Sequence, residues 1–214
     1  HYISHDLSDD GVLTVLFDRE ERLNAFSTDM FNEVKRILET VDDEEVACVV
    51  FEGAGDRAFS AGADITGFTT ADATDLAKVD ETVQTIYEYP RPTIAKIDGF
   101  CLGAGLEITL ACDLRYATED SKLGSPEIDL GLIPGGGGTQ RLVRLVGEPR
   151  TKEMVYRGMQ LSAEKAEDWG ILNRAVEDDE FEALIDDVTS DLANGPQTAL
   201  EVAKKVIQQG QNAS

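Results

Sequence analysis

Two glutamates in this sequence stand close to glycine-rich turns. Glu107 follows the turn at residues 103–105, and Glu127 comes twenty positions later, shortly before four consecutive glycines at residues 135–138. A carboxyl group can give or take a proton, and the N–H groups at a helix start stabilise negative charge. The pattern therefore indicates acid/base chemistry beside a pocket that can stabilise an anion.

Each glutamate also has an ordinary structural explanation. Glu107 would lie in the first turn of a helix, where a carboxylate complements the helix dipole, and Glu127 could be a solvated loop residue. Taken singly, these explanations are the stronger ones. Because both glutamates are flanked by apolar residues and glycine, the pair favours the acid/base interpretation.

The glycine-rich segments do not match a nucleotide-binding motif. Residues 103–105 lack the third glycine of a dinucleotide fingerprint, and residues 135–138 lack the Lys-Ser/Thr of a P-loop. They could be tight turns where backbone packs on backbone. Alternatively, the N–H groups of Ala63 and Ala104 could point at one substrate oxygen, where each donor is worth about 2.7–4 kcal/mol to a transition state. The spacing supports these two interpretations about equally.

A serine hydrolase would also need a pocket that stabilises an anion. Ser60 and Ser125 are the candidate nucleophiles, but both histidines, His1 and His5, lie at the N-terminus. Neither serine therefore has a suitable histidine base. A metal site is disfavoured too, since there is no Cys-x-x-Cys pair and the three cysteines lie in apolar stretches, as reduced core residues do.

The chain is strongly acidic. It has 42 acidic and 19 basic residues among 214, a net charge of −23, which disfavours nucleic-acid and anionic-membrane partners. The acidic residues are spread along the chain, so an ordinary acidic enzyme is one interpretation. We favour a protein of a salt-rich cytoplasm, where the Debye length is about 3 Å at 1 M salt. The sequence has no apolar run of about 18 residues and no signal peptide at residues 1–5, so we expect a cytoplasmic protein without a membrane span.

The elements that must position the glutamates follow an α/β pattern. Strands are predicted at residues 11–18, 46–51, 93–97, 113–118, 122–124 and 173–176. Helices are predicted after Ser27 and at residues 76–89, 106–111, 139–146, 150–157, 163–169, 180–192 and 196–208. Strand–strand–helix units followed by helices predict one α/β domain with a helical end.

Four segments, at residues 22–26, 58–65, 98–115 and 124–142, together resemble the crotonase family, and most closely its enoyl-CoA hydratases. The match covers nearly the whole chain, in order and at the expected spacing. The resemblance implies a spiral of repeated β-β-α units with C-terminal helices, in one domain over residues 1–214 with its core in about 1–195. It also implies that residues 196–214 begin a C-terminal helical region that is truncated here, and that the subunits form trimers or dimers of trimers.

The resemblance also assigns roles at the site. It implies that an acyl-CoA thioester oxygen lies between the N–H groups of Ala63 and Ala104, the latter standing where the family usually has glycine. Glu107 and Glu127 would hold a water between them; Glu107 would help to activate this water for addition to C3, and Glu127 would exchange the proton at C2. The N–H of Gly135 would help to position Glu127 or the water. Neither a metal nor a redox cofactor is implied, since coenzyme A enters as part of the substrate.

The contacts with coenzyme A are expected in the first two segments and the central turn. These residues are Arg22, Asn24, Ala25, Ala61, Gly62, Asp64, Ile65 and Gly103. Thr66 departs from a basic residue that hydratases often have there, so Arg22 is the candidate cation for the phosphates.

The expected reaction is the reversible addition of water across the 2,3 double bond of a 2-enoyl-CoA. An enoyl-CoA isomerase of the same family is the nearest alternative, although many isomerases keep only one of the two carboxyl groups. Thioester hydrolysis and decarboxylation, other reactions of the family, rank lower. A non-catalytic acyl-CoA-binding subunit is an alternative of a different class, against which the retention of both glutamates argues.

Overall fold

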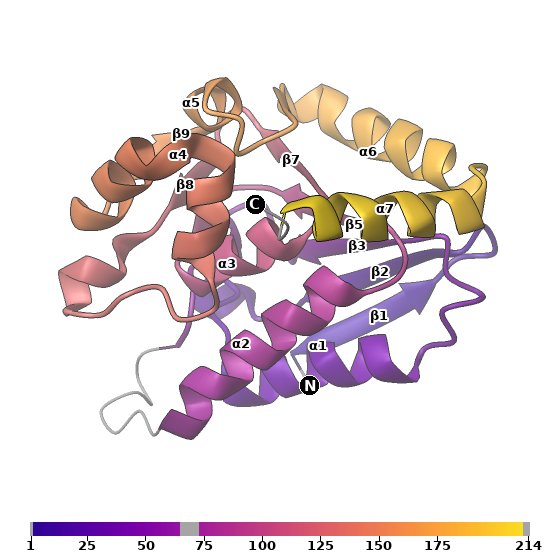
Figure 1. Cartoon of the computed structure of the whole chain (residues 1–214), viewed down its shortest axis with the longest axis horizontal. Helices are drawn as coiled ribbons and strands as arrows, with labels where there is room; N and C mark the ends of the chain where they lie inside the picture. Colours follow the sequence, from indigo (N-terminus) through magenta and orange to yellow (C-terminus); the bar gives the residue numbers. More distant parts are fainter. Residues whose placement is uncertain (1, 65–72, 212–214) are drawn as a thin grey trace.

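The computed structural model describes residues 2–64 and 73–211, which form two β-sheets with helices packed around them (Figure 1). The large sheet has the order β1 (Ile3–Leu7), β2 (Val12–Phe17), β3 (Cys48–Gly53), β5 (Thr93–Ile97), β7 (Leu114–Thr118) and β10 (Arg174–Val176). The small sheet has the order β4 (Ala58–Ser60), β6 (Phe100–Leu102), β8 (Lys122–Gly124) and β9 (Gln160–Ser162). The helices are α1 (Thr28–Thr40), α2 (Ala73–Glu88), α3 (Ala104–Ala111), α4 (Gly138–Tyr156), α5 (Ala163–Asp168), α6 (Asp178–Ala193) and α7 (Gln197–Gln211), with short 3-10 helices η1 (Glu20–Arg22) and η3 (Pro126–Leu130).

A repeated unit of two strands and a helix builds both sheets. The units are β3-β4-α2, β5-β6-α3 and β7-β8-α4, the last with η3 before its helix. The first strands of the units pair in parallel in the large sheet, and the second strands pair in parallel in the small sheet. Equivalent positions of successive units therefore lie side by side. This arrangement confirms the α/β fold of strand–strand–helix units that the sequence predicts.

Helices cover both faces of the large sheet. On one face, side chains of α1, α2 and α3 join those of β2, β3 and β5 in the main core, whereas Phe181 and Ile185 of α6 pack with Val50 and Ile94 on the other face. Burying an apolar side chain of this size contributes about 1.5–3 kcal/mol. The two cores fix the large sheet as a rigid frame for the small one.

Aromatic packing connects this frame to the loop after η1. The ring of Phe17 in β2 lies 4.7 Å from that of Phe26 and 5.2 Å from that of Phe59 in β4, measured between centroids. Next to Phe26, Ser27 caps α1 by accepting a hydrogen bond from the N–H of Met30, as predicted. The chain near residue 26 is thus held against β4, whose end forms part of the site.

The sequence predicts no strand at β1 of the large sheet or at β4, β6 and β9 of the small sheet, whereas β8 confirms the strand predicted at residues 122–124. Strands of three residues are too short to show an alternating pattern. The helices predicted at 139–146 and 150–157 are confirmed as two helical segments of α4, which meet at Gly147 with φ 78° and ψ 165°.

In the described part of the chain, no helix is both long enough and apolar enough to cross a membrane.

Candidate active site

Three parallel strands of the small sheet end beside one cavity of about 360 Å³. β4 leads into residues 61–64, β6 leads into Gly103 and the start of α3, and β8 leads into Ser125 and η3. The cavity is lined by Arg22, Ala25, Ala61, Gly62, Ala63, Asp64, Val79, Gly103, Ala104, Glu107, Pro126, Glu127, Leu130, Leu132, Ile133 and Gly135. The parallel pairing therefore brings together segments that are about forty and twenty residues apart in the sequence.

Glu107 lies in the first turn of α3 and is almost completely buried, with 4% of its surface exposed. Its Oε1 accepts hydrogen bonds from the N–H groups of Gly136, at 2.8 Å, and Gly138, at 2.9 Å. Burial raises the pKa of Glu107 and the Glu127 carboxylate adds to the rise, while the two N–H groups and Arg141 oppose it, so that the resulting pKa is about 7. A carboxyl group with this pKa can exchange a proton near neutral pH.

Glu127 lies in η3 on the wall of the same cavity. Its Oε2 accepts a hydrogen bond of 2.8 Å from the hydroxyl of Ser125. Burial raises the pKa of Glu127 as well, and the Ser125 hydroxyl opposes the rise. Two carboxyl groups that face one cavity, each with a raised pKa, are suited to exchange protons with the same bound molecule.

The turns that follow β4 and β6 touch each other. Gly62 has φ 105° and Gly103 has φ 53°, backbone conformations that favour glycine, and a Cβ at Gly62 would lie only 3.1 Å from the Leu102 carbonyl oxygen. The same Cβ would lie 3.6 Å from the nitrogen of Ala104. Close approach of the two backbones therefore requires glycine at residue 62.

The N–H groups of Ala63 and Ala104 are available to a ligand. The carbonyl of Gly62 and the N–H of Asp64 both bond to the backbone of Phe26, each at 2.8 Å, so the N–H of Ala63 between them points the other way. Ala104 begins α3, where an N–H group has no partner within the helix. Neither N–H donates to another group among the described residues.

Residues 8–213 match the protein family described as enoyl-CoA hydratase/isomerase. The chain belongs to this family. The short-chain-enoyl-CoA hydratase of Clostridium acetobutylicum is 32% identical over 204 residues, which are 93% of this chain and 78% of that protein. The crystal structure of an enoyl-CoA hydratase from Bacillus anthracis is similar with a TM-score of 0.95 and 33% identity, covering 100% of this chain and 85% of that one.

A crystal structure from Thermobifida fusca, determined in complex with CoA, is similar with a TM-score of 0.92 and 27% identity, and covers 100% of this chain and 86% of that one. These findings confirm the resemblance to the crotonase family and its α/β spiral. The described part of the chain also has the repeated strand–strand–helix units that the resemblance implies.

The structure places most residues expected from the crotonase resemblance at the cavity. Both glutamates, Ala63, Ala104 and Gly135 line it, as do six of the residues expected to contact coenzyme A: Arg22, Ala25, Ala61, Gly62, Asp64 and Gly103. An ion pair of 2.8 Å between Arg19 and Asp64, together with a hydrogen bond from Arg19 to the Ala25 carbonyl, joins the two segments that carry these residues. Ile65 and Thr66 lie outside the described residues.

Among the expected coenzyme A contacts that the structure describes, Asn24 is the one that does not line the cavity. It is completely buried, and its amide donates to the carbonyl oxygens of Ala58, at 2.7 Å, and Ala54, at 3.0 Å. Its φ of 53° lies in the left-handed region, which asparagine tolerates better than most residues. Asn24 therefore shapes the loop that presents Ala25, and we correct its assignment from ligand contact to structural residue.

The groups that hold the two glutamates were not predicted from the sequence. Gly135 is the expected donor to Glu127 or to a water, whereas the observed donors are Gly136 and Gly138, and they hold Glu107. Four glycines before a helix were a usable signal, because the free N–H groups at a helix start attract a carboxylate. The Ser125 hydroxyl, two residues before Glu127, had a similar local signal.

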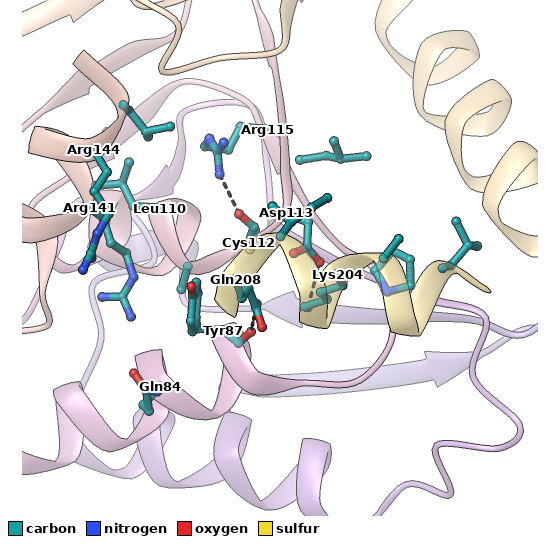
Figure 2. Close-up of a pocket in the computed structure, with 17 residues that line it drawn as sticks. Gln84, Tyr87, Leu110, Cys112, Asp113, Arg115, Arg141, Arg144, Lys204 and Gln208 are labelled. Carbon is teal, nitrogen blue, oxygen red and sulfur yellow. Dashed lines mark hydrogen bonds and ion pairs between the residues drawn. The ribbon is translucent and has the colours of Figure 1, made fainter. Parts of the chain in front are cut away.

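A second cleft, of about 580 Å³, lies between α2, α4 and α7 (Figure 2). Tyr87, Arg141, Arg144 and Lys204 line it, and Lys204 pairs with Asp113 at 2.7 Å. Neither glutamate lies on its wall. The smaller cavity, which contains both glutamates, is therefore the candidate active site of this crotonase-family protein.

Proposed function

We propose that this protein is an enoyl-CoA hydratase, which adds water reversibly across the 2,3 double bond of a 2-enoyl-CoA to give a 3-hydroxyacyl-CoA. One observation carries the proposal: Glu107 and Glu127 share a cavity with the available N–H groups of Ala63 and Ala104. The relatives named as enoyl-CoA hydratases support the same activity.

In the proposed reaction, the two N–H groups bind the thioester oxygen of the substrate. As the water oxygen bonds to C3, electrons move from the double bond onto this oxygen, so an enolate develops between Ala63 and Ala104. The positive end of the α3 dipole lies at the same place and stabilises the charge. Each backbone donor is worth about 2.7–4 kcal/mol when charge develops in the transition state.

The two carboxyl groups carry the protons. Glu107, as the carboxylate, takes a proton from the water that adds to C3, and Glu127, as the acid, gives a proton to C2. Proton exchange then restores both groups, and the sum of the steps is the addition of one water. Burial raises the pKa of both residues, so each can exchange a proton near neutral pH, and the division into base and acid follows the crotonase resemblance.

The walls of the cavity support an acyl-CoA as the substrate. Arg22, exposed at the rim, supplies a cation for the phosphates, and backbone from Ala25 and residues 61–64 lies along the expected path of the pantetheine. The acyl chain would lie against the apolar side chains of the cavity: Val79, Leu130, Leu132 and Ile133. In this proposal, coenzyme A belongs to the substrate, and the reaction proceeds without a metal or redox cofactor.

The proposal extends to the state of the protein in the cell. We propose a homotrimer or a dimer of trimers in a salt-rich cytoplasm. Exposed apolar side chains on α7, Val202 at 53%, Val206 at 61% and Ile207 at 64%, support association between subunits. The net charge of −23 supports adaptation to high salt.

The experiment that tests the function is incubation of the purified protein with crotonyl-CoA and, separately, with a 3-enoyl-CoA. We expect crotonyl-CoA to lose its enone absorbance and chromatography to identify 3-hydroxybutyryl-CoA. Double-bond migration in the 3-enoyl-CoA without hydration of crotonyl-CoA would indicate the isomerase instead. Binding of both compounds without turnover of either would indicate a non-catalytic subunit.

A further inference from the structure

Arg141 lies in the first turns of α4, three residues after one of the two donors to Glu107. Its Nη1 donates a hydrogen bond of 2.8 Å to the carbonyl oxygen of Gly136. Its guanidinium carbon lies 5.2 Å from the centre of the Tyr87 ring in α2, at cation–π distance. Figure 2 shows Arg141 and Tyr87 on the wall of the larger cleft.

Gly136 connects this arginine to the catalytic carboxyl group. Its N–H donates to Glu107, and its carbonyl accepts from Arg141, so the two side chains hold opposite ends of one residue. The next residue, Gly137, has φ 82°, and a Cβ there would collide with Nη1 of Arg141. A run of four glycines has no side chains to restrain it, and glycine has the greatest backbone freedom. Through its hydrogen bond to Gly136 and its cation–π contact with Tyr87, Arg141 links this run to α2.

The charge of Arg141 and its hydrogen bond to Gly136 both favour the carboxylate form of Glu107. The charged groups that act on Glu107 are Glu127 from η3, which favours the protonated carboxyl group, and Arg141 from α4, which favours the carboxylate. Arg141 itself is faced by Tyr87 and Asp80 from α2 and by Arg144 from its own helix. Removal of the guanidinium would therefore loosen the two N–H donors and remove a positive charge near Glu107.

We propose that Arg141 is a positioning residue for the hydration step, which holds the Gly136–Gly138 backbone so that its N–H groups fix Glu107 in place. The inference rests on the proposed function, because it gives Arg141 a role only through the catalytic use of Glu107. Arg141 does not line the substrate cavity, so it acts through the glycine loop.

Arg141→Ala tests the proposal, and Arg144→Ala is the matched control. Arg144 lies one turn further along α4, lines the same cleft and makes no hydrogen bond to the glycine loop in the described structure. Misplacement of a catalytic group by about 1 Å can reduce the rate about 10²-fold. We expect kcat for crotonyl-CoA to fall by about 10- to 100-fold in Arg141→Ala with KM changed little, and to stay within about 2-fold of wild type in Arg144→Ala.

Two further measurements separate positioning from general damage to the fold. First, the acidic limb of the pH–kcat profile should move to higher pH in Arg141→Ala, because the charge that lowers the pKa of Glu107 is gone. Second, the larger cleft opens Arg141 to solvent, so added guanidinium ion at millimolar concentration should restore part of the activity. Sodium chloride at equal ionic strength is the control and should not restore it.

An Arg141→Ala variant with the kcat and acidic limb of wild type would overturn the proposal. So would a loss of kcat with an unmoved acidic limb and no response to guanidinium. If Arg141→Ala does not fold by circular dichroism, Arg141→Gln keeps a hydrogen-bond donor without the charge, and an unmoved acidic limb in that variant would equally overturn it. A wild-type protein that does not hydrate crotonyl-CoA would refute the proposed function itself, which is a distinguishable result.

Discussion

At the scale of single residues, opposing effects on the pKa of Glu107 suit this residue to its proposed role. Burial disfavours its charged form, while hydrogen bonds from Gly136 and Gly138 to one oxygen favour it. The resulting pKa of about 7 is near the value at which a carboxyl group is most effective as an acid or base at neutral pH. Glu127 lies in a more open position, and its pKa is raised mainly by burial.

Glu107→Gln should stabilise the protein at high pH. The folded-state pKa of about 7 exceeds the ordinary value of 4.5, so the folded protein binds more protons than the unfolded chain in this window and loses stability as the pH rises through it. Glutamine avoids this loss and keeps an oxygen that can accept from Gly136 and Gly138. We expect the free energy of unfolding of the Glu107→Gln variant in urea to exceed that of wild type by on the order of 1–3 kcal/mol at about pH 8, and by less at about pH 5.5. An equal difference at both pH values would contradict the assigned pKa.

Ser125→Ala should slow the reaction without unfolding the protein. The hydroxyl bonds Oε2 of Glu127 at 2.8 Å, and a hydrogen bond to a charged group is worth about 1.5–3 kcal/mol. Its loss should raise the pKa of Glu127 further and reduce kcat about 10-fold, with circular dichroism unchanged. A kcat equal to that of wild type would show that Ser125 does not orient Glu127.

At the scale of elements, the site depends on short strands with non-local partners. The apolar runs predicted the large-sheet strands β3, β5 and β7, because buried parallel strands are continuously hydrophobic. The small-sheet strands β4 and β6 have three residues each, too few to show a period, so the sequence did not predict the strand pairing that brings Ala63 close to Ala104. That the N–H groups of these two residues lie close together was expected only from the family resemblance.

The position of Glu107 could be predicted from the sequence, but its hydrogen-bond donors could not. The helix start at Glu107 was predicted from glycines and apolar residues that are its neighbours in the chain. Its donors at Gly136 and Gly138 are 29 and 31 residues away, and no local pattern specifies which carboxyl group a glycine run will meet. The left-handed turn at Asn24 was missed for the same reason, since its amide partners lie 30 and 34 residues further along.

Gly105→Ala should disturb the packing of α3 against β4. A Cβ at this position would lie 2.8 Å from both the Cβ and the carbonyl oxygen of Ser60, so the helix must move. Overpacking of this kind costs about 1–3 kcal/mol, and the displacement of α3 should lower kcat because α3 carries Ala104 and Glu107. Gly210→Ala on α7 is the control, since nothing lies within 4 Å of its Cβ and alanine favours a helix by about 1 kcal/mol. Equal effects of the two substitutions on urea unfolding would contradict the packing argument.

At the scale of the whole molecule, the large sheet with helices on both faces is the frame, and the small sheet presents the chemistry at the ends of its parallel strands. The acidic surface surrounds this frame, with more than twice as many acidic as basic residues. Exposed ion pairs such as Lys35–Glu81 contribute little, typically about 0–1 kcal/mol, so repulsion among the unpaired carboxylates dominates the surface electrostatics.

The thermal midpoint of unfolding should therefore rise when potassium chloride is increased from about 0.05 to 0.5 M. Over this range the Debye length falls from about 14 to 4 Å, which screens repulsion between carboxylates more than it weakens the few ion pairs. Differential scanning calorimetry at constant pH measures the change. A midpoint that stays constant or falls with salt would contradict the proposed adaptation to a salt-rich cytoplasm.

The most direct test of the central claim, that Glu107 and Glu127 together add water to an enoyl-CoA, is the turnover of crotonyl-CoA by the variants Glu107→Gln and Glu127→Gln. Both side chains keep their size, and binding of a saturated acyl-CoA, measured in the same preparations, reports whether the cavity is intact. The account predicts that kcat falls by about 10²–10⁴-fold in each variant, while binding and circular dichroism stay close to wild type. Near-wild-type turnover in both variants would contradict it.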